Sequence, residues 1–152
     1  MENISFIDNT PYPFKPGETI LEYVRRNRGR NLIPTLCQSD NLENYGSCRI
    51  CSVEVALSPD GPSKVMASCH TPVGPGYYIY TSTEKIKKLR KNIIELVLSD
   101  YPHEKINPRD GDMPTEFQEV LVSIGIPEVR YPSTEEKRKY QPDRSHPYIW
   151  SD

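Results

Sequence analysis

The spacing of the cysteines restricts this chain more than any other feature of its sequence. Cys37, Cys48, Cys51 and Cys69 follow the pattern Cys-x10-Cys-x2-Cys-x17-Cys, which uses every cysteine present. Three clustered ligands on one loop and a fourth from a neighbouring strand form the layout of a [2Fe-2S] site. The plant-type pattern has four residues in its first gap, so the wider gap after Cys37 predicts a longer loop of the same kind.

Two other uses of four cysteines compete with this interpretation. A structural zinc site also takes four thiolates, but all-cysteine zinc sites usually show two Cys-x2-Cys pairs, and this chain has one. Disulfides belong to oxidising compartments, whereas residues 1–4 (Met-Glu-Asn-Ile) lack the features of a signal peptide, so we expect a cytoplasmic protein. The pattern therefore favours an iron-sulfur cluster over zinc or disulfides.

Residues between the cysteines have the chemistry that such a cluster needs. An oxidised cluster on four thiolates is formally dianionic and gains a further negative charge on reduction, so backbone N–H groups and shielding from water must stabilise it. Gly46, which lacks a Cβ, lets the backbone approach closely. Ser47 and Arg49 offer N–H groups, and Arg49 offers a positive charge unless it is an ordinary exposed cation. Four thiolates complete the coordination, so His70 is not expected to be a ligand.

Composition and motifs exclude several function classes. The formal net charge of −2 argues against a nucleic-acid partner. No apolar run approaches the roughly 20 residues that span a bilayer, so no direct membrane insertion is expected. No Ser-His-Asp pattern, carboxylate pair, phosphate-binding loop or nicotinamide site stands out. We therefore do not expect the chain alone to turn over a substrate.

The order of elements predicts an α+β fold. An alternating strand from Cys51 should direct Val53, Val55 and Leu57 to one face. Thr81 and Glu84 are spaced as a capping box that opens a long helix. We expect residues 1–99 to form one domain and residues 100–152 an extension, with a short helix from Pro114 and an aperiodic tail that binds a partner. The expected strands are 3–7, 12–14, 51–57, 64–68 and 77–80, and the first helix is 18–27.

Several runs of residues resemble a known family. They are residues 10–22, the run Gly-Ser-Cys-Arg-Ile-Cys-Ser-Val-Glu-Val at 46–55, the run Ala-Ser-Cys-His-Thr-Pro-Val at 67–73, and residues 79–81 before a helix. Together they resemble the N-terminal [2Fe-2S] domain of the large iron-sulfur subunit of NADH:quinone oxidoreductase. The same domain occurs in [FeFe] hydrogenases, NAD-reducing hydrogenases and NAD-linked formate dehydrogenases. The resemblance implies a β-grasp ferredoxin-like fold with a C-terminal helical and extended tail, and the four cysteines as cluster ligands.

One departure from that family is informative. In the relatives a His-and-three-Cys motif for a [4Fe-4S] cluster follows the closing helix, but here Tyr101 stands where the histidine would be and no cysteine follows Cys69. The chain therefore resembles a shortened relative with one [2Fe-2S] cluster. We expect a single-electron relay subunit of a multi-subunit oxidoreductase, working between a flavin- or metal-containing catalytic subunit and another carrier. The alternatives are a free soluble ferredoxin and a zinc-stabilised interaction module.

Overall fold

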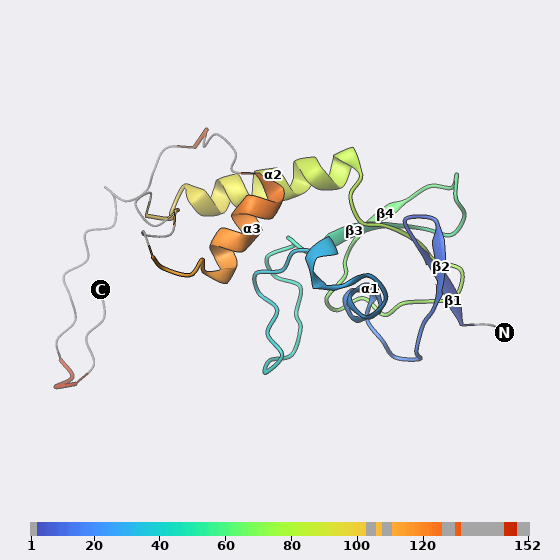
Figure 1. Cartoon of the computed structure of the whole chain (residues 1–152), viewed down its shortest axis with the longest axis horizontal. Helices are drawn as coiled ribbons and strands as arrows, with labels where there is room; N and C mark the ends of the chain where they lie inside the picture. Colours follow the sequence, from blue (N-terminus) through green and yellow to red (C-terminus); the bar gives the residue numbers. More distant parts are fainter. Residues whose placement is uncertain (1–2, 103–105, 108–110, 126–129, 132–144, 149–152) are drawn as a thin grey trace.

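The computed structural model describes residues 3–102, 106–107, 111–125, 130–131 and 145–148 and contains a five-stranded mixed sheet (Figure 1). The strands lie in the order β2-β1-β5-β3-β4. The predicted α+β class is confirmed. The elements are β1 (Ile4–Ile7), β2 (Thr10–Pro13), α1 (Ile20–Arg28), the 3-10 helix η1 (Arg30–Leu32), β3 (Ser52–Ala56), β4 (Lys64–Ala67), β5 (Tyr78–Tyr80), α2 (Glu84–Leu98) and α3 (Glu116–Ile124).

Strand β5 joins the two hairpins of the sheet. It pairs in parallel with β1 and antiparallel with β3, while β1 and β2 form one antiparallel hairpin and β3 and β4 the other. The rings of Phe6 and Tyr78 stack across the parallel pair, with their centroids 4.3 Å apart. The hairpin that carries Cys69 is thereby fixed to the N-terminal hairpin.

Helix α1 covers one face of the sheet. Thr19 and Glu22 form a capping box at its start, in which the Thr19 hydroxyl accepts from the Glu22 N–H and the Glu22 carboxylate accepts from the Thr19 N–H. Its apolar residues recur at helical spacing and pack against inward-facing strand residues in one core. This core includes Ile7, Ile20, Leu21, Tyr23, Val24, Val53, Val55 and Ile79.

Replacement of Tyr23 by phenylalanine should destabilise this core. Tyr23 is fully buried, and its hydroxyl donates to the carbonyls of Ser5 (2.6 Å) and Tyr12 (3.0 Å). Burial raises the pKa of Tyr23 to about 12, so the hydroxyl keeps its proton. We expect Tyr23→Phe to lower the free energy of unfolding by about 1 to 3 kcal/mol, measured by denaturation of the cluster-loaded protein. Tyr80→Phe removes an exposed hydroxyl bonded to Pro59 and should change it by less than about 0.5 kcal/mol; equal effects would contradict the prediction.

Helix α2 begins later than the sequence suggested. Its N-cap is Thr83, whose hydroxyl accepts from the Ile86 N–H at 3.2 Å. Thr81 is instead fully buried, and its N–H (2.9 Å) and hydroxyl (2.8 Å) donate to the carboxylate of Asp8. The predicted Thr81 capping box is therefore wrong, because Thr81 is used to hold the β1–β2 turn.

Strand β3 is buried on both faces, whereas alternating side chains are typical of a strand with one exposed face. Leu57, predicted to share a face with Val53 and Val55, lies beyond the strand and is 78% exposed. Glu54, on the opposite face of the strand from Val53 and Val55, is also buried, because α2 packs against β3. Its carboxylate accepts hydrogen bonds from the side chains of Ser63, Thr83 and Lys85.

A second apolar core joins α3 to the cysteine loop. Ile50, Ile94, Leu98, Val120 and Leu121 are its buried members, and Leu36, Cys48, Phe117 and Ile124 pack against them. Helix α3 begins at Glu116 rather than at the predicted Pro114, behind a capping box of Thr115 and Gln118. Val120 and Leu121 of α3 face this core. Most of the tail predicted to bind a partner, residues 132–144 and 149–152, lies outside the described residues.

No helix among the described residues has the length and apolar character required to cross a membrane.

Candidate metal centre

The fold brings the four cysteines together from two parts of the chain. Cys37, Cys48 and Cys51 lie on the loop between η1 and β3, and Cys69 follows β4 by two residues. Cys51 and Cys69 are buried, whereas Cys37 and Cys48 are half-buried, and none of them forms a disulfide. The centre therefore has an inner side against the core and an outer side nearer the surface.

The thiols interact as two pairs. The side chains of Cys37 and Cys48 lie within hydrogen-bonding reach of each other, as do those of Cys51 and Cys69, and Cys37 also acts electrostatically on Cys69. Among the described residues, no three His, Cys, Asp or Glu side chains are arranged around a single ion position. Two pairs of thiolates are the donor set of a cluster with two irons.

Backbone N–H groups point at the sulfur atoms. Burial raises the pKa of Cys37, but hydrogen bonds from the N–H and thiol of Cys48 and from the N–H groups of Ser47 and Cys37 itself outweigh it and hold that pKa below its usual value. Burial, together with the nearby Cys51, raises the pKa of Cys69 to about 12 although the Gly46 N–H opposes the shift. Donors of this kind stabilise anionic sulfur. The residues present therefore fit a [2Fe-2S] cluster.

Two positions in the loop adopt the left-handed backbone conformation. Gly46 has φ +67°, and a Cβ there would lie 3.1 Å from Cδ2 and 3.2 Å from Nε2 of His70. Arg49 has φ +62°, and its carbonyl accepts from the N–H (3.1 Å) and hydroxyl (2.7 Å) of Ser52. The Ser47 N–H acts on Cys37 and the Gly46 N–H on Cys69. The side chain of Arg49 is exposed.

Two arginines outside the predicted site residues form hydrogen bonds to residues that flank the cysteines. Arg25 of α1 donates to the side chains of Thr35 (2.9 Å) and Gln38 (2.8 Å), on either side of Cys37. Arg90 of α2 donates to the backbone carbonyls of Ile50 and Ser52, on either side of Cys51. A signal for Arg90 is present in the sequence, since it lies four residues from both Ile86 and Ile94 on the buried stripe of α2.

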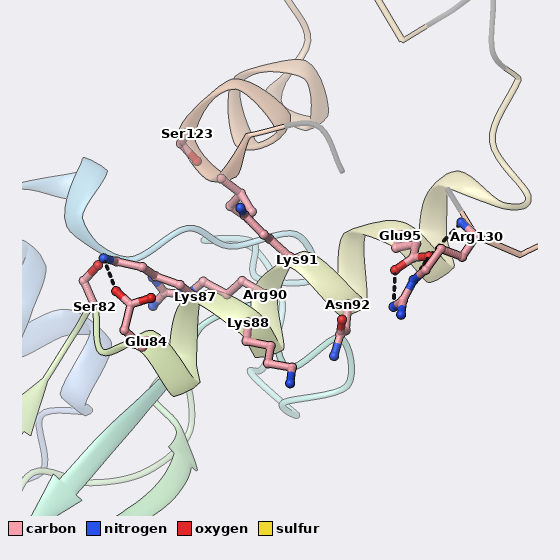
Figure 2. Close-up of a pocket in the computed structure, with 11 residues that line it drawn as sticks. Ser82, Glu84, Lys87, Lys88, Arg90, Lys91, Asn92, Glu95, Ser123 and Arg130 are labelled. Atoms are coloured by element: carbon pink, nitrogen blue, oxygen red, sulfur yellow. Dashed lines mark hydrogen bonds and ion pairs between the residues drawn. The ribbon is translucent and has the colours of Figure 1, made fainter. Parts of the chain in front are cut away.

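A polar groove also lies between α2 and α3 but contains none of the cysteines. It has a volume of 730 Å³, and Lys87, Lys88, Lys91 and Ser123 are among the residues that line it. Figure 2 shows Lys87 paired with Glu84 at one end of the groove, and Glu95 paired with Arg130 at the other. Its lysines belong to a charged helix face, and Arg90, which contacts the carbonyls on either side of Cys51, also lines the groove.

The comparison with protein families agrees with this geometry. Residues 3–84 match the family described as 2Fe-2S iron-sulfur cluster binding domain. The chain belongs to this family. Its cofactor is a [2Fe-2S] cluster, and the resemblance to the N-terminal domain of the NADH:quinone oxidoreductase iron-sulfur subunit is confirmed.

Its relatives are subunits of oxidoreductases. The chain is 32% identical over 120 residues to NADPH-Fe(3+) oxidoreductase subunit alpha of Geobacter sulfurreducens, covering 79% of this chain and 13% of that protein. It is 36% identical over 97 residues to the NADH-ubiquinone oxidoreductase 75 kDa subunit of Reclinomonas americana, covering 64% of this chain and 13% of that protein. The chain thus spans about an eighth of the length of these curated relatives.

A solved structure shows the same fold. The structure of an NAD+-reducing [NiFe]-hydrogenase in the H2-reduced state matches with a TM-score of 0.74 at 28% identity, over 100% of this chain and 60% of that chain. The chain is accordingly a [2Fe-2S] domain of the kind found in oxidoreductase subunits.

Proposed function

We propose that this chain transfers single electrons through one [2Fe-2S] cluster, as a subunit of a multi-subunit oxidoreductase. It would work between a flavin- or metal-containing catalytic subunit and another carrier. One observation carries the proposal: the four thiols of this 2Fe-2S family chain lie as two pairs, and backbone N–H groups interact with them.

The pairing also supports an assignment of the ligands. Cys37 and Cys48 would hold one iron and Cys51 and Cys69 the other, since each iron takes two thiolates. When bound, the cluster accepts and releases one electron. The N–H groups around Cys37 and the Gly46 N–H at Cys69 would stabilise the negative charge on sulfur.

The surface around the loop supports exchange with a protein partner. Leu42 and Tyr45 lie between the first two cysteines of the pattern, and their exposed fractions are 67% and 66%. Exposed apolar side chains are enriched where proteins associate. Together with the half-buried Cys37 and Cys48, they give this side of the centre the character of an electron-exchange surface.

Anaerobic purification from the native host tests the proposal, with native mass and visible spectrum recorded on the same sample. The expected result is a reddish-brown assembly of several subunits with about two irons and two sulfides on this chain. A reddish-brown monomer would favour a free ferredoxin. A colourless protein containing zinc would overturn the assignment of electron transfer.

Removal of residues 131–152 should weaken assembly but not cluster binding. Polar, aperiodic segments of this kind commonly order on a partner. Arg130 stays in place in this variant, and its side chain and N–H hold the buried carboxylate of Glu95 on α2. We expect unchanged iron content and an about tenfold loss of partner affinity, equivalent to about 1.4 kcal/mol. Unchanged co-purification of partner subunits with the truncated chain would refute the role of the tail.

A further inference from the structure

Arg90 is a charged residue in an apolar part of the molecule. It lies on the inner face of α2, where Ile86, Ile94 and Leu98 are fully buried, and only 6% of its surface is exposed. Lysines 87, 88 and 91 of the same helix point to solvent, and Figure 2 shows them around Arg90 on α2. Removal of a guanidinium from water is costly unless an opposite charge compensates it.

The contacts of Arg90 are to uncharged groups. Its Nε donates to the Ile50 carbonyl at 3.2 Å, and its Nη2 donates to the Ser52 carbonyl at 3.0 Å. These carbonyls belong to the residues on either side of Cys51. Within the described part of the chain, no carboxylate forms an ion pair with Arg90. Nε and Nη2 are therefore hydrogen-bonded, but within the described residues no carboxylate supplies an opposite charge to the guanidinium.

The four-cysteine site, to which Cys51 belongs, is negatively charged when it holds the cluster. Burial lowers the pKa of Arg90 to about 10, and the negative charge of Cys51 opposes that shift, so the guanidinium remains charged at neutral pH. A cluster on four thiolates carries two negative charges, and reduction adds a third. An opposite charge in a region of low dielectric interacts more strongly with the reduced form than with the oxidised form.

We propose that Arg90 is the buried countercharge of the [2Fe-2S] cluster and raises its reduction potential. This inference rests on the proposed function. By bracketing Cys51 through the two carbonyls, α2 holds the charge at a fixed position, so Arg90 is a positioning residue for electron transfer rather than a ligand.

Other cations near the loop are poorer candidates for this role. Arg49 is exposed, so water screens its charge. Arg25 also interacts electrostatically with Cys51, but it is only half-buried and the nearby carboxylate of Asp40 acts on it as well. Arg90 combines burial, a fixed geometry and the absence of a carboxylate partner among the described residues.

The test compares the cluster-loaded full chain with three variants, Arg90→Gln, Arg90→Lys and Lys88→Gln. Midpoint potentials are measured by anaerobic equilibration with reduced dyes of known potential, and iron and sulfide content is determined on each sample. For Arg90→Gln we expect the equilibrium constant for one-electron reduction to fall at least tenfold, which corresponds to about 59 mV. Arg90→Lys keeps the charge and should stay within about threefold of the wild type. Lys88→Gln removes an exposed charge of the same helix and should change the constant by less than about twofold.

The outcomes separate a charge effect from a structural one. An unchanged potential in loaded Arg90→Gln overturns the inference and leaves the proposed function intact. If Arg90→Gln does not retain a cluster, Arg90→Lys decides: assembly with a potential near the wild type supports the countercharge, whereas loss of the cluster in both variants shows that the hydrogen bonds, not the charge, are required. A wild-type chain without iron and sulfide would defeat the proposed function itself.

Discussion

Replacement of Cys51 by alanine is expected to abolish cluster binding. Iron and acid-labile sulfide should fall from about two of each per chain to near zero, and the visible absorption should disappear. Cys51 is buried beside Cys69, and its carbonyl accepts from the Ser68 hydroxyl at 2.7 Å. No other side chain of the pattern is free to replace it, because the three remaining cysteines are already assigned as ligands.

His70→Ala is the matched control for the cysteine replacement. His70 follows Cys69 directly, is exposed, and is a side chain able to bind metal. The alanine variant should keep the full iron and sulfide content. Loss of the cluster in His70→Ala, or its retention in Cys51→Ala, would show that the proposed set of ligands is incorrect.

The cysteine pattern could be recognised in the sequence because its central part is local. Cys48 and Cys51 have two residues between them and follow Gly46 closely, and the strand after them leads directly into the sheet. Backbone conformation and N–H direction in such a loop depend mainly on neighbouring residues. The α+β class followed in the same way from alternating strands and amphipathic helices.

The features that the sequence analysis missed depend on distant parts of the chain. Thr81 resembles an N-cap until Asp8 is known to lie beside it. The alternation that includes Glu54 and Leu57 is typical of a strand with one solvent-exposed face. Helix α2 covers the face that carries Glu54, so Glu54 is buried, and Leu57 lies beyond the end of the strand. Arg90 lies among lysines in the sequence. Its helical spacing from Ile86 and Ile94 places it on the buried face of α2, but its contact with the carbonyls beside Cys51 depends on how α2 packs against β3.

Replacement of Gly46 by alanine should shorten the lifetime of the bound cluster. Its φ of +67° is costly for an L-residue, by about 1 to 2 kcal/mol, and the new Cβ would lie 3.1 Å from the His70 ring. The strain acts where the Gly46 N–H faces Cys69. We expect the rate of cluster loss to rise by about 5- to 30-fold, followed as the decay of visible absorption in the presence of an iron chelator.

Two further variants divide this effect into its causes. Gly17→Ala carries a similar backbone strain, with φ +81°, but nothing lies within 4 Å of the new Cβ. It should lower overall stability without selectively shortening cluster lifetime. The double variant Gly46→Ala/His70→Ala removes the contact with the ring and should recover only part of the lifetime, since the backbone strain remains. Equal lifetimes in Gly46→Ala and Gly17→Ala would mean that Gly46 serves only as a turn residue, and the close approach of its backbone to the cluster would have to be abandoned.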